Sequence, residues 1–352
     1  MDLAHAEDPR RSGRPRVLAA STDADQPLLG AGGGGSLKQG LDMIQGLKDD
    51  GEQIELDLLD VSEMRDDAYA VMVAGLGSPV AMLDPDMPRF GPDAVFAYRA
   101  FQKAFAAEGK KLEYLYSGEM GGFNTFTPML VAILSDKDPA KRIKFVDADG
   151  NGRAVPELNT TINAFYDHPP KPMGMGSLYG DEIIVYPTTD HSGEQIARQM
   201  CMLYNMRIGF ATWGMNKEEI TNILDVGCVT KAQKIGKAIL TAKETGSDVM
   251  DELKKAFEVR EFCRGTIEKL DLRAEGGFDF GTTVIKGDDG HTYYIDFKNE
   301  NLILRDEKGD TIMTAPEGIG MIDLNNCFPL TNADTKEGMR VLVTMTPAHP
   351  NW

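Results

Sequence analysis

The sequence has few cysteines and no long hydrophobic run. Its four cysteines lie far apart without a CxxC pair, which argues against a disulfide framework and a cysteine-rich zinc site. No window approaches the roughly 18 apolar residues of a membrane span, so no association with a membrane is expected. The apolar run after the basic cluster at residues 10–16 is too short for a signal peptide, and we therefore expect a cytoplasmic protein.

Standard cofactor and nucleophile motifs are also missing. The histidines form no HExxH or other metal-ligand spacing, and there is no GxSxG elbow. Basic residues are in deficit, and the formal net charge of −18 argues against nucleic acid, because binding to phosphates needs a basic surface. We expect no cofactor, and a small polar molecule as the ligand.

What is present is an ordinary globular composition, with 42% hydrophobic and 26% charged residues over 352 positions. This length suits two domains of roughly 100–200 residues each. The proline-rich stretch at 168–172 breaks the periodicity and serves as the predicted boundary. We predict a mobile segment at 1–27, an N-terminal α/β domain at 28–170 and a C-terminal α+β domain at 171–352.

The order of the predicted elements supports this division. Strands alternate with helices in the first domain, which predicts a mostly parallel sheet covered on both faces. A proline-bounded region at 78–92 interrupts this alternation. From about 259 to 346 the hydrophobic period shifts towards two between turn signals, which predicts an antiparallel β module. Helices are predicted at 37–48, 93–108, 127–134, 193–206, 217–224, 231–245 and 249–257, the last with Asp248 as its cap.

The glycine-rich stretch at 30–35 precedes the first of these helices. Glycine amides at a helix N-terminus attract anions, but the stretch lacks the lysine of a P-loop and the strand that precedes a dinucleotide fingerprint. Two interpretations stay open: a tight connection into the helix, or a backbone wall beside a small ligand. In the second, Gly33 and Gly34 contact the substrate.

The most informative stretch covers residues 117–161. A strand at 143–146 delivers Asp147, Asp149, Arg153 and Glu157 at its end, and ligands usually bind at the carboxyl ends of strands in open α/β sheets. Buried charges are costly unless they are paired, so packing alone is a poor reason for this concentration. We predict that these four residues form the catalytic site.

Two alternatives compete for the same turn. Asp147, Asp149 and Asn151 have the spacing of a calcium loop, but Leu158 occupies the position of the essential glutamate and a strand precedes the loop. A structural network of aspartate and arginine side chains is the second alternative. No metal is expected, although a divalent ion between Asp147 and Asp149 stays open.

Two further segments supply candidate substrate contacts. Glu119, Gly121, Gly122 and Asn124 form a turn before the helix at 127–134, where backbone amides could stabilise negative charge. In the β module, Asn299, Glu300 and Asn301 interrupt an alternating strand pair. They form either a hairpin or bulge, or a polar wall of a cleft shared by the two domains.

Several of these motifs together resemble one known family. LLGAGGGGS, GEMGGFNTFTPMLVA, VDADGNGRAVPELNTT, EGGFDFGT and FKNENL occur in the order and approximate spacing of the DUF917, or S-methyl thiohydantoin desulfurase-like, family. The resemblance covers about residues 28–345 and is most specific at 146–161. It departs from the family pattern at Asn151, Val155 and Asn159, which flank the carboxylates.

The resemblance implies an activity, namely the hydrolytic loss of methanethiol from an S-methylated thiohydantoin. Family members often accompany hydantoinase- or oxoprolinase-type proteins, so a hydantoinase-type partner is implied, and a homo-oligomer is expected. For this reaction Asp147 or Asp149 would activate water, Arg153 would bind a substrate carboxylate or an aspartate, and Glu157 would orient Arg153. A non-catalytic accessory or ligand-binding subunit is the alternative function, and a plain hydantoin is an alternative substrate.

Overall fold

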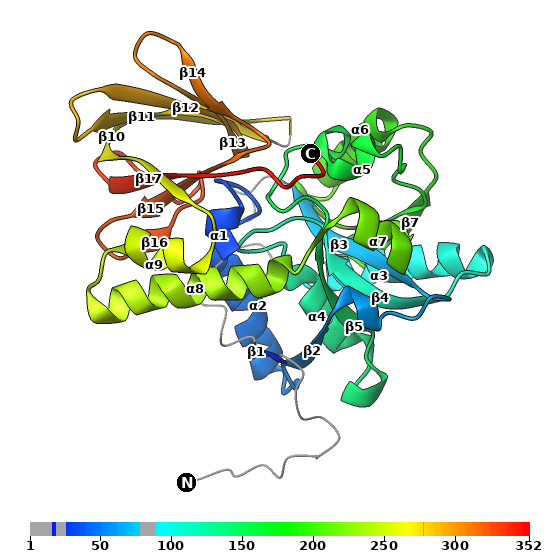
Figure 1. Cartoon of the computed structure of the whole chain (residues 1–352). Coiled ribbons are helices and arrows are strands. Elements are labelled where there is room, and N and C mark those ends of the chain that lie inside the picture. The colour runs from blue at the N-terminus through cyan, green and yellow to red at the C-terminus, as the bar shows by residue number, and fades with distance from the viewer. Residues whose placement is uncertain (1–15, 19–25, 78–88, 277) are drawn as a thin grey trace.

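The computed structural model describes residues 16–18, 26–77, 89–276 and 278–352. The predicted mobile segment 1–27 and the proline-bounded region 78–92 therefore lie mostly outside the described residues. The described chain builds two β-sheets, which lie side by side in Figure 1 with helices α8 (Cys228–Thr245) and α9 (Val249–Ala256) beneath the second sheet.

The first sheet has nine strands and a parallel centre. Strands β2, β5, β4 and β3 are neighbours and run parallel, as the alternation of strands and helices predicts. Antiparallel strands flank this centre, in the order β1-β2-β5-β4-β3-β8-β6-β7 with β9 beside β5. The strands are β1 (Arg16–Leu18), β2 (Glu55–Leu59), β3 (Tyr69–Gly77), β4 (Leu112–Ser117), β5 (Lys144–Asp149), β6 (Met173–Gly176), β7 (Glu182–Val185), β8 (Arg207–Asn216) and β9 (Asp225–Val226).

Helices cover both faces of this sheet, which confirms the prediction. One face packs α2 (Leu37–Asp49), α3 (Pro92–Ala107) and α4 (Phe126–Ser135) around buried Phe101, Phe126 and Phe145. The other face packs α6 (Asp190–Leu203) and α7 (Lys217–Ile223) through Ala197 and Ile220. The short helices α1 (Gln26–Leu29) and α5 (Ile162–Phe165) lie in connections.

The first sheet extends beyond residue 170, where the sequence places the domain boundary. Strand β8 pairs with β3 along its length, and β6 and β7 follow at the same edge. The physical reason is the burial of β8, in which seven successive residues, from Arg207 to Trp213, are buried and need neighbours on both faces. The proline-rich stretch is thus a connection within this sheet.

The second sheet has eight strands, all paired antiparallel, as the period of two predicts. Side chains of β12 alternate between buried and half-buried positions, which places one face on a core that contains Ile295 and Leu304. The strand order is β14-β13-β12-β11-β10-β17-β15-β16. The strands are β10 (Arg260–Glu275), β11 (Phe278–Gly287), β12 (Thr292–Lys298), β13 (Glu300–Arg305), β14 (Thr311–Thr314), β15 (Gly318–Asp323), β16 (Phe328–Pro329) and β17 (Arg340–Thr346).

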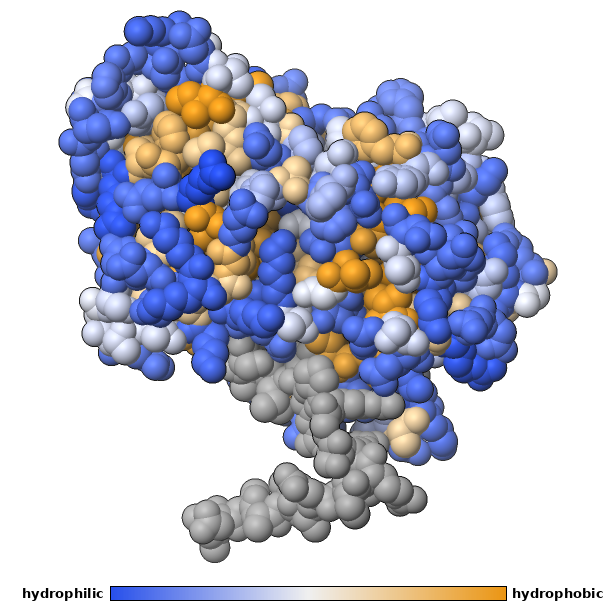
Figure 2. Space-filling view, in the orientation of Figure 1, coloured by the Kyte–Doolittle hydropathy of each residue, from blue (hydrophilic) through white to orange (hydrophobic). Residues whose placement is uncertain are grey.

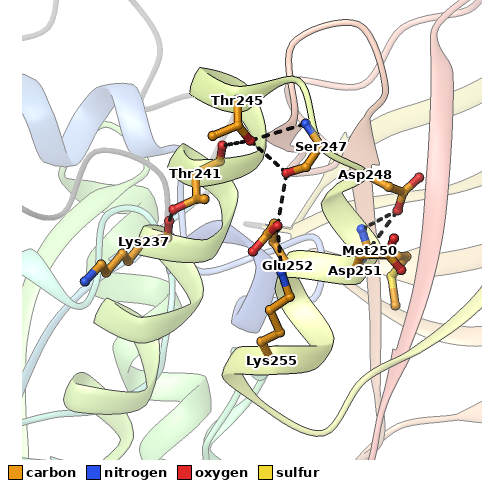
Figure 3. Close-up of polar contacts among 9 residues, drawn as sticks. All are labelled: Lys237, Thr241, Thr245, Ser247, Asp248, Met250, Asp251, Glu252 and Lys255. Atoms are coloured by element: carbon orange, nitrogen blue, oxygen red, sulfur yellow. Dashed lines mark hydrogen bonds and ion pairs between the residues drawn. The ribbon is translucent and has the colours of Figure 1, made fainter.

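The turn between α8 and α9 is held by side chains (Figure 3). Asp248 caps α9 by accepting hydrogen bonds from the amides of Met250 (2.8 Å) and Asp251 (3.4 Å), as predicted. The Ser247 hydroxyl donates to Glu252 at 3.1 Å. This turn folds α9 back onto α8, so that the two helices share a core with residues of α1, β15 and β17.

The surface is mainly hydrophilic on the face drawn in Figure 2, where hydrophobic side chains gather in separate patches. Among the described residues, no helix combines the length and apolar character that crossing a membrane requires.

Candidate functional site

A cavity with polar and apolar walls lies where the two sheets meet. It encloses about 740 Å³ of space, part of it open to solvent. The first sheet contributes β3, the turns after β4 and β5, and residues of β8, while the second contributes the β12–β13 turn. The cavity therefore has walls from both halves of the chain. Its carboxylates and amides come from Glu119, Asn124, Asn151, Glu157, Glu194, Asn299 and Glu300.

Glu119 lies just after β4 and is held in place by two hydrogen bonds. Its Oε1 accepts from Asn124 Nδ2 at 2.5 Å and its Oε2 accepts from the amide of Val155 at 3.0 Å. Asn124 Oδ1 in turn accepts from the amide of Gly75 in β3 at 2.8 Å, which fixes the amide orientation. Burial raises the pKa of Glu119, although these hydrogen bonds and two nearby arginines oppose the shift.

Glu300 reaches the same cavity from the second sheet. It begins β13, is only 2% exposed, and its Oε2 accepts no hydrogen bond from the described residues. Burial raises the pKa of Glu300 well above its ordinary value, and the charge of Glu119 raises it further, against the charge of Arg153. Two carboxyl groups with raised pKa values thus line one cavity.

Among the described residues Arg153 forms no ion pair with an aspartate, which was one of its two expected partners, the other being a substrate carboxylate. Its guanidinium donates to the carbonyls of Glu317 (2.6 Å), Asn301 (3.1 Å) and Ala154 (2.9 Å). Burial lowers the pKa of Arg153 to about 10, while the charges of Glu300 and Glu119 act in the opposite direction. The side chain therefore ties the turn after β5 to the second sheet.

Asp147 and Asp149 do not line this cavity. Asp147 accepts from the amide of Val229 (2.8 Å) and from the hydroxyl of Thr230 (2.5 Å), which satisfies donors at the N-terminus of α8. Asp149 is fully buried, and its Oδ1 accepts from the amides of Asn151 and Gly152. Burial raises the pKa of both groups.

The alternation of β5 explains this placement. The side chains of Asp147 and Asp149 share the face of Phe145, which packs in the core with α2, α3 and α4. Val146 and Ala148 point to the opposite face, in the core with α6 and α7. The predicted strand at 143–146 is observed at Lys144–Asp149, so both aspartates lie within it, and the sequence does not indicate which face of the strand the cavity occupies.

The two glycine turns pack against each other. The carbonyl of Gly34 accepts hydrogen bonds from the amides of Phe123 (3.1 Å) and Asn124 (3.2 Å). A Cβ on Gly121 would lie 2.4 Å from Gly34 Cα, so only glycine permits this approach. Of the four glycines predicted to contact substrate, Gly33, Gly34, Gly121 and Gly122, only Gly34 lines the cavity. Gly35 lines it as well.

The remaining glycines have other neighbours. The amide of Gly121 donates to Thr125 Oγ1 at 3.1 Å and is therefore unavailable as an oxyanion donor. Gly122 lies against the start of α2, because a Cβ there would be 2.3 Å from the amide nitrogen of Leu37. Gly33 packs against Glu300, with a hypothetical Cβ 2.0 Å from its Oε1. The glycine turns hold the cavity together more than they line it.

The asparagines beside Glu300 have separate environments. Asn299 adopts φ 58° and lines the cavity, while its Oδ1 accepts from the amide of Asp279 at 2.8 Å. Asn301 Nδ2 donates to the carbonyl of Ile319 at 2.9 Å, inside the second sheet. The segment thus forms both a tight turn and a cavity wall.

Two charged residues at the cavity escape sequence analysis. In α6, Glu194 and Arg198 form a buried ion pair of 2.6 Å, and Glu194 also accepts from the amide of Leu158 at 2.9 Å. Arg198 lies over the ring of Phe278, 4.0 Å from its centroid. Their spacing of four residues was the available signal, but such pairs are usual on exposed helix faces.

An ion pair at the edge of the cavity joins the two sheets. Lys298 of β12 forms an ion pair of 2.9 Å with Glu157 and also lies 4.1 Å from the ring centroid of Phe278. Glu157, predicted to orient Arg153, therefore binds a lysine of the second sheet.

Trp213 lines the cavity from an irregular point in β8. Its φ of 52° is left-handed and coincides with a register shift between β3 and β8. Bulges of this kind often re-aim side chains next to active sites. Its indole nitrogen donates to the carbonyl of His168 at 3.0 Å.

No three His, Cys, Asp or Glu side chains among the described residues are arranged to hold a metal ion. At the position left open for a divalent ion, Asp147 uses both oxygens on α8.

Comparisons with known proteins agree with this architecture. Residues 26–187 match the model of the S-Me-THD-like N-terminal domain, and residues 188–352 match that of the S-Me-THD-like C-terminal domain. An X-ray crystal structure of a protein from Chromobacterium violaceum is similar, with a TM-score of 0.75 and 23% identity over 95% of this chain and 92% of that chain. At this identity the likeness extends to the fold alone. No curated protein matches the sequence.

Proposed function

Because the chain belongs to the S-Me-THD-like family across residues 26–352, we propose that it is a hydrolase acting on a small cyclic ureide-type ring. The most concrete form of the proposal is hydrolysis of an S-methyl thiohydantoin with release of methanethiol, since the family is named after such a desulfurase. The observation that carries it is the meeting of Glu119 and Glu300, from different sheets, on one cavity.

The two carboxyl groups differ in a way that suits acid–base chemistry. Glu119 accepts two hydrogen bonds that favour its ionised form, whereas Glu300 has an oxygen without a partner and the more strongly raised pKa. Pairs of groups whose environments separate their pKa values commonly divide the roles of base and acid. We assign Glu119 as the general base and protonated Glu300 as the general acid.

The proposed reaction proceeds by direct attack of water and needs no covalent bond between the enzyme and the substrate. Glu119 takes a proton from water as its oxygen bonds to the ring carbon that carries sulfur, and Glu300 protonates the neighbouring ring nitrogen. The carbon–sulfur bond of the tetrahedral intermediate then breaks, and the leaving thiolate takes the proton from Glu119. The hydroxyl proton of the intermediate returns to Glu300, which leaves the oxo ring and methanethiol.

The rest of the cavity suits a flat polar ring. The amide side chains of Asn124 and Asn299 flank the two carboxyl groups, while Phe123, Phe210 and Trp213 supply apolar wall. Buried polar groups at fixed positions orient a ligand, and apolar walls desolvate it. Asp147 and Asp149 support this site through the helix α8 and the turn after β5.

Methanethiol release from an S-methylated thiohydantoin tests the proposal. Headspace detection of methanethiol avoids the reaction of thiol reagents with Cys327, which is partly exposed. Purified protein should release methanethiol in step with the oxo product, and Glu119→Gln should not, whereas the exposed control Glu268→Gln should behave as wild type. Oxo ring or methanethiol formation at equal rates with Glu119→Gln and wild type would overturn the assignment of Glu119. Activity that needs an added hydantoinase-type protein would instead support the accessory role.

A further inference from the structure

A second cavity lies behind the turn that follows β5. It encloses about 990 Å³ of space, part of it open to solvent, and shares only Asn151 with the first cavity among their lining residues. Its wall includes the turn at Gly152, the strand β9 and the beginning of α8. The segment after β17 forms another part of the wall. This segment ends at the C-terminus, which lies near α5 in Figure 1.

Asp225 in β9 is the unusual residue of this wall. Its side chain is 9% exposed, and its Oδ2 accepts no hydrogen bond from the described residues. Lys231 Nζ is 3.9 Å from this oxygen, and His349 Nε2 is 3.5 Å from Oδ1. Both distances exceed the roughly 2.7–2.9 Å of a charge-assisted hydrogen bond, so the carboxylate is incompletely satisfied.

A second buried carboxyl group is the register partner of Asp225. Asp149 is the register partner of Asp225 in the β5–β9 pair and is also buried, with its own Oδ2 free of hydrogen-bond partners in the described structure. Directly opposed residues of an antiparallel pair place their side chains on one face, roughly 4.5–5.5 Å apart at Cβ. Buried carboxylates are costly unless a positive charge or donor meets them.

Asp225 lies against the backbone of Gly152. Gly152 adopts φ 70°, and a Cβ there would lie 2.7 Å from Asp225 Oδ2. Trp352 closes another part of the wall, and its indole nitrogen donates to the carbonyl of Asn151 at 3.0 Å.

We propose that this second cavity binds a small organic molecule through a protonated nitrogen, a primary ammonium or a guanidinium, which donates to Asp225 Oδ2. The bound cation takes the place that Lys231 fills only loosely. Lys231 is 42% exposed and can move into solvent when the ligand enters. The site is separate from the two carboxyl groups of the proposed reaction. Its test therefore measures ligand binding and does not depend on catalytic activity.

Matched probes of one size distinguish a cation site from an anion site. n-Butylammonium, n-butylguanidinium and butyrate are titrated separately into the full chain at constant ionic strength, and binding is measured by ligand-observed NMR. We expect saturable binding of the two cations and none of butyrate. Asp225→Asn should weaken cation binding by about tenfold or more, because it removes a charged acceptor.

The direction in which Lys231→Met changes the affinity distinguishes a cation site from an anion site. This variant removes the competing ammonium, so cation binding should tighten, whereas a site for anions would lose affinity in the same variant. Because Lys231 is partly exposed, its replacement is tolerated more easily, and this variant keeps the test valid even where Asp225→Asn does not fold. Asp310→Asn in the exposed β13–β14 turn is the control and should bind as wild type. Cation binding that Lys231→Met leaves unchanged or weakens, preferential binding of butyrate, or no binding of any probe would each overturn the proposal.

Discussion

Replacing Glu300 with Gln should stabilise the protein increasingly as the pH rises. Glu300 is 2% exposed, and its burial raises its pKa well above the ordinary value of 4.5. The native state therefore holds a proton on Glu300 at pH values where the unfolded chain has lost it. Stability from this group is fully present below pH 4.5 and is lost as the pH rises through the native pKa.

The magnitude follows from one proton. Between the two pKa values the native state binds one proton more than the unfolded state, so the free energy of unfolding falls by about 1.4 kcal/mol per pH unit. Gln has the shape of the protonated acid and does not titrate. The difference in unfolding free energy between Glu300→Gln and wild type should thus grow by about 3 kcal/mol over two pH units in this window.

Urea denaturation at half-unit steps from pH 5 to pH 8, at constant ionic strength, measures this difference. Glu119 titrates in both proteins, and its interaction with the charge of Glu300 is part of the measured difference. Glu268→Gln, on the exposed side of β10, should follow wild type at every pH. A difference between Glu300→Gln and wild type that stays constant across the range would show that Glu300 is ionised in the native state, and the reasoning would be wrong.

Other perturbations separate chemistry from support. Glu119→Gln should lower turnover by about 10²–10⁴-fold, the usual contribution of a general base, as measured by methanethiol release; a loss under threefold would contradict its role. Gly33→Ala should destabilise the protein by about 1–3 kcal/mol in urea, because its Cβ would meet Glu300 Oε1 at 2.0 Å, whereas Gly309→Ala meets nothing within 4 Å and should show only the cost of its φ of 89°. Asp147→Ala should cost about 0.5–2 kcal/mol of stability by removing an acceptor for the N-terminus of α8, with turnover of the folded protein preserved. Turnover that collapses in stable Asp147→Ala protein would restore Asp147 as a catalytic residue.

Local patterns predict most elements of the fold. The helix predicted at 93–108 is observed at Pro92–Ala107, and the helix predicted at 127–134 is observed at Phe126–Ser135. Periodicity and caps are local properties, so the sequence carries them directly. Strands β14, β15 and β16 lie within the predicted β module, but the sequence does not delimit them, because they are short or interrupted by glycine and find their partners only within the folded sheet.

The site was harder to predict because its parts come from distant segments. The segments around Glu119 and Glu300 were recognised, but their meeting depends on how the second sheet docks on the first. Asp147 and Asp149 do not line the cavity, because their side chains share the face of Phe145, which packs in the core with α2, α3 and α4. Glu194 and Arg198 were missed because a helical ion pair carries no sign of its burial.

The contacts of the glycine-rich stretch have a consequence for synthesis on the ribosome. The carbonyl of Ala31 accepts from the amide of Asn301 at 2.7 Å, and that of Gly32 accepts from the amide of Asn332 at 2.8 Å. Asn301 and Asn332 are synthesised late in translation. The carbonyls of Ala31 and Gly32 therefore lack these partners until most of the chain has been made. Pairing between such remote segments slows folding and exposes unfinished chains to chaperones and proteases. A nascent chain that stalls before β13 would therefore lack both hydrogen bonds between its first and last quarters. We expect such a chain to be degraded faster than the complete one.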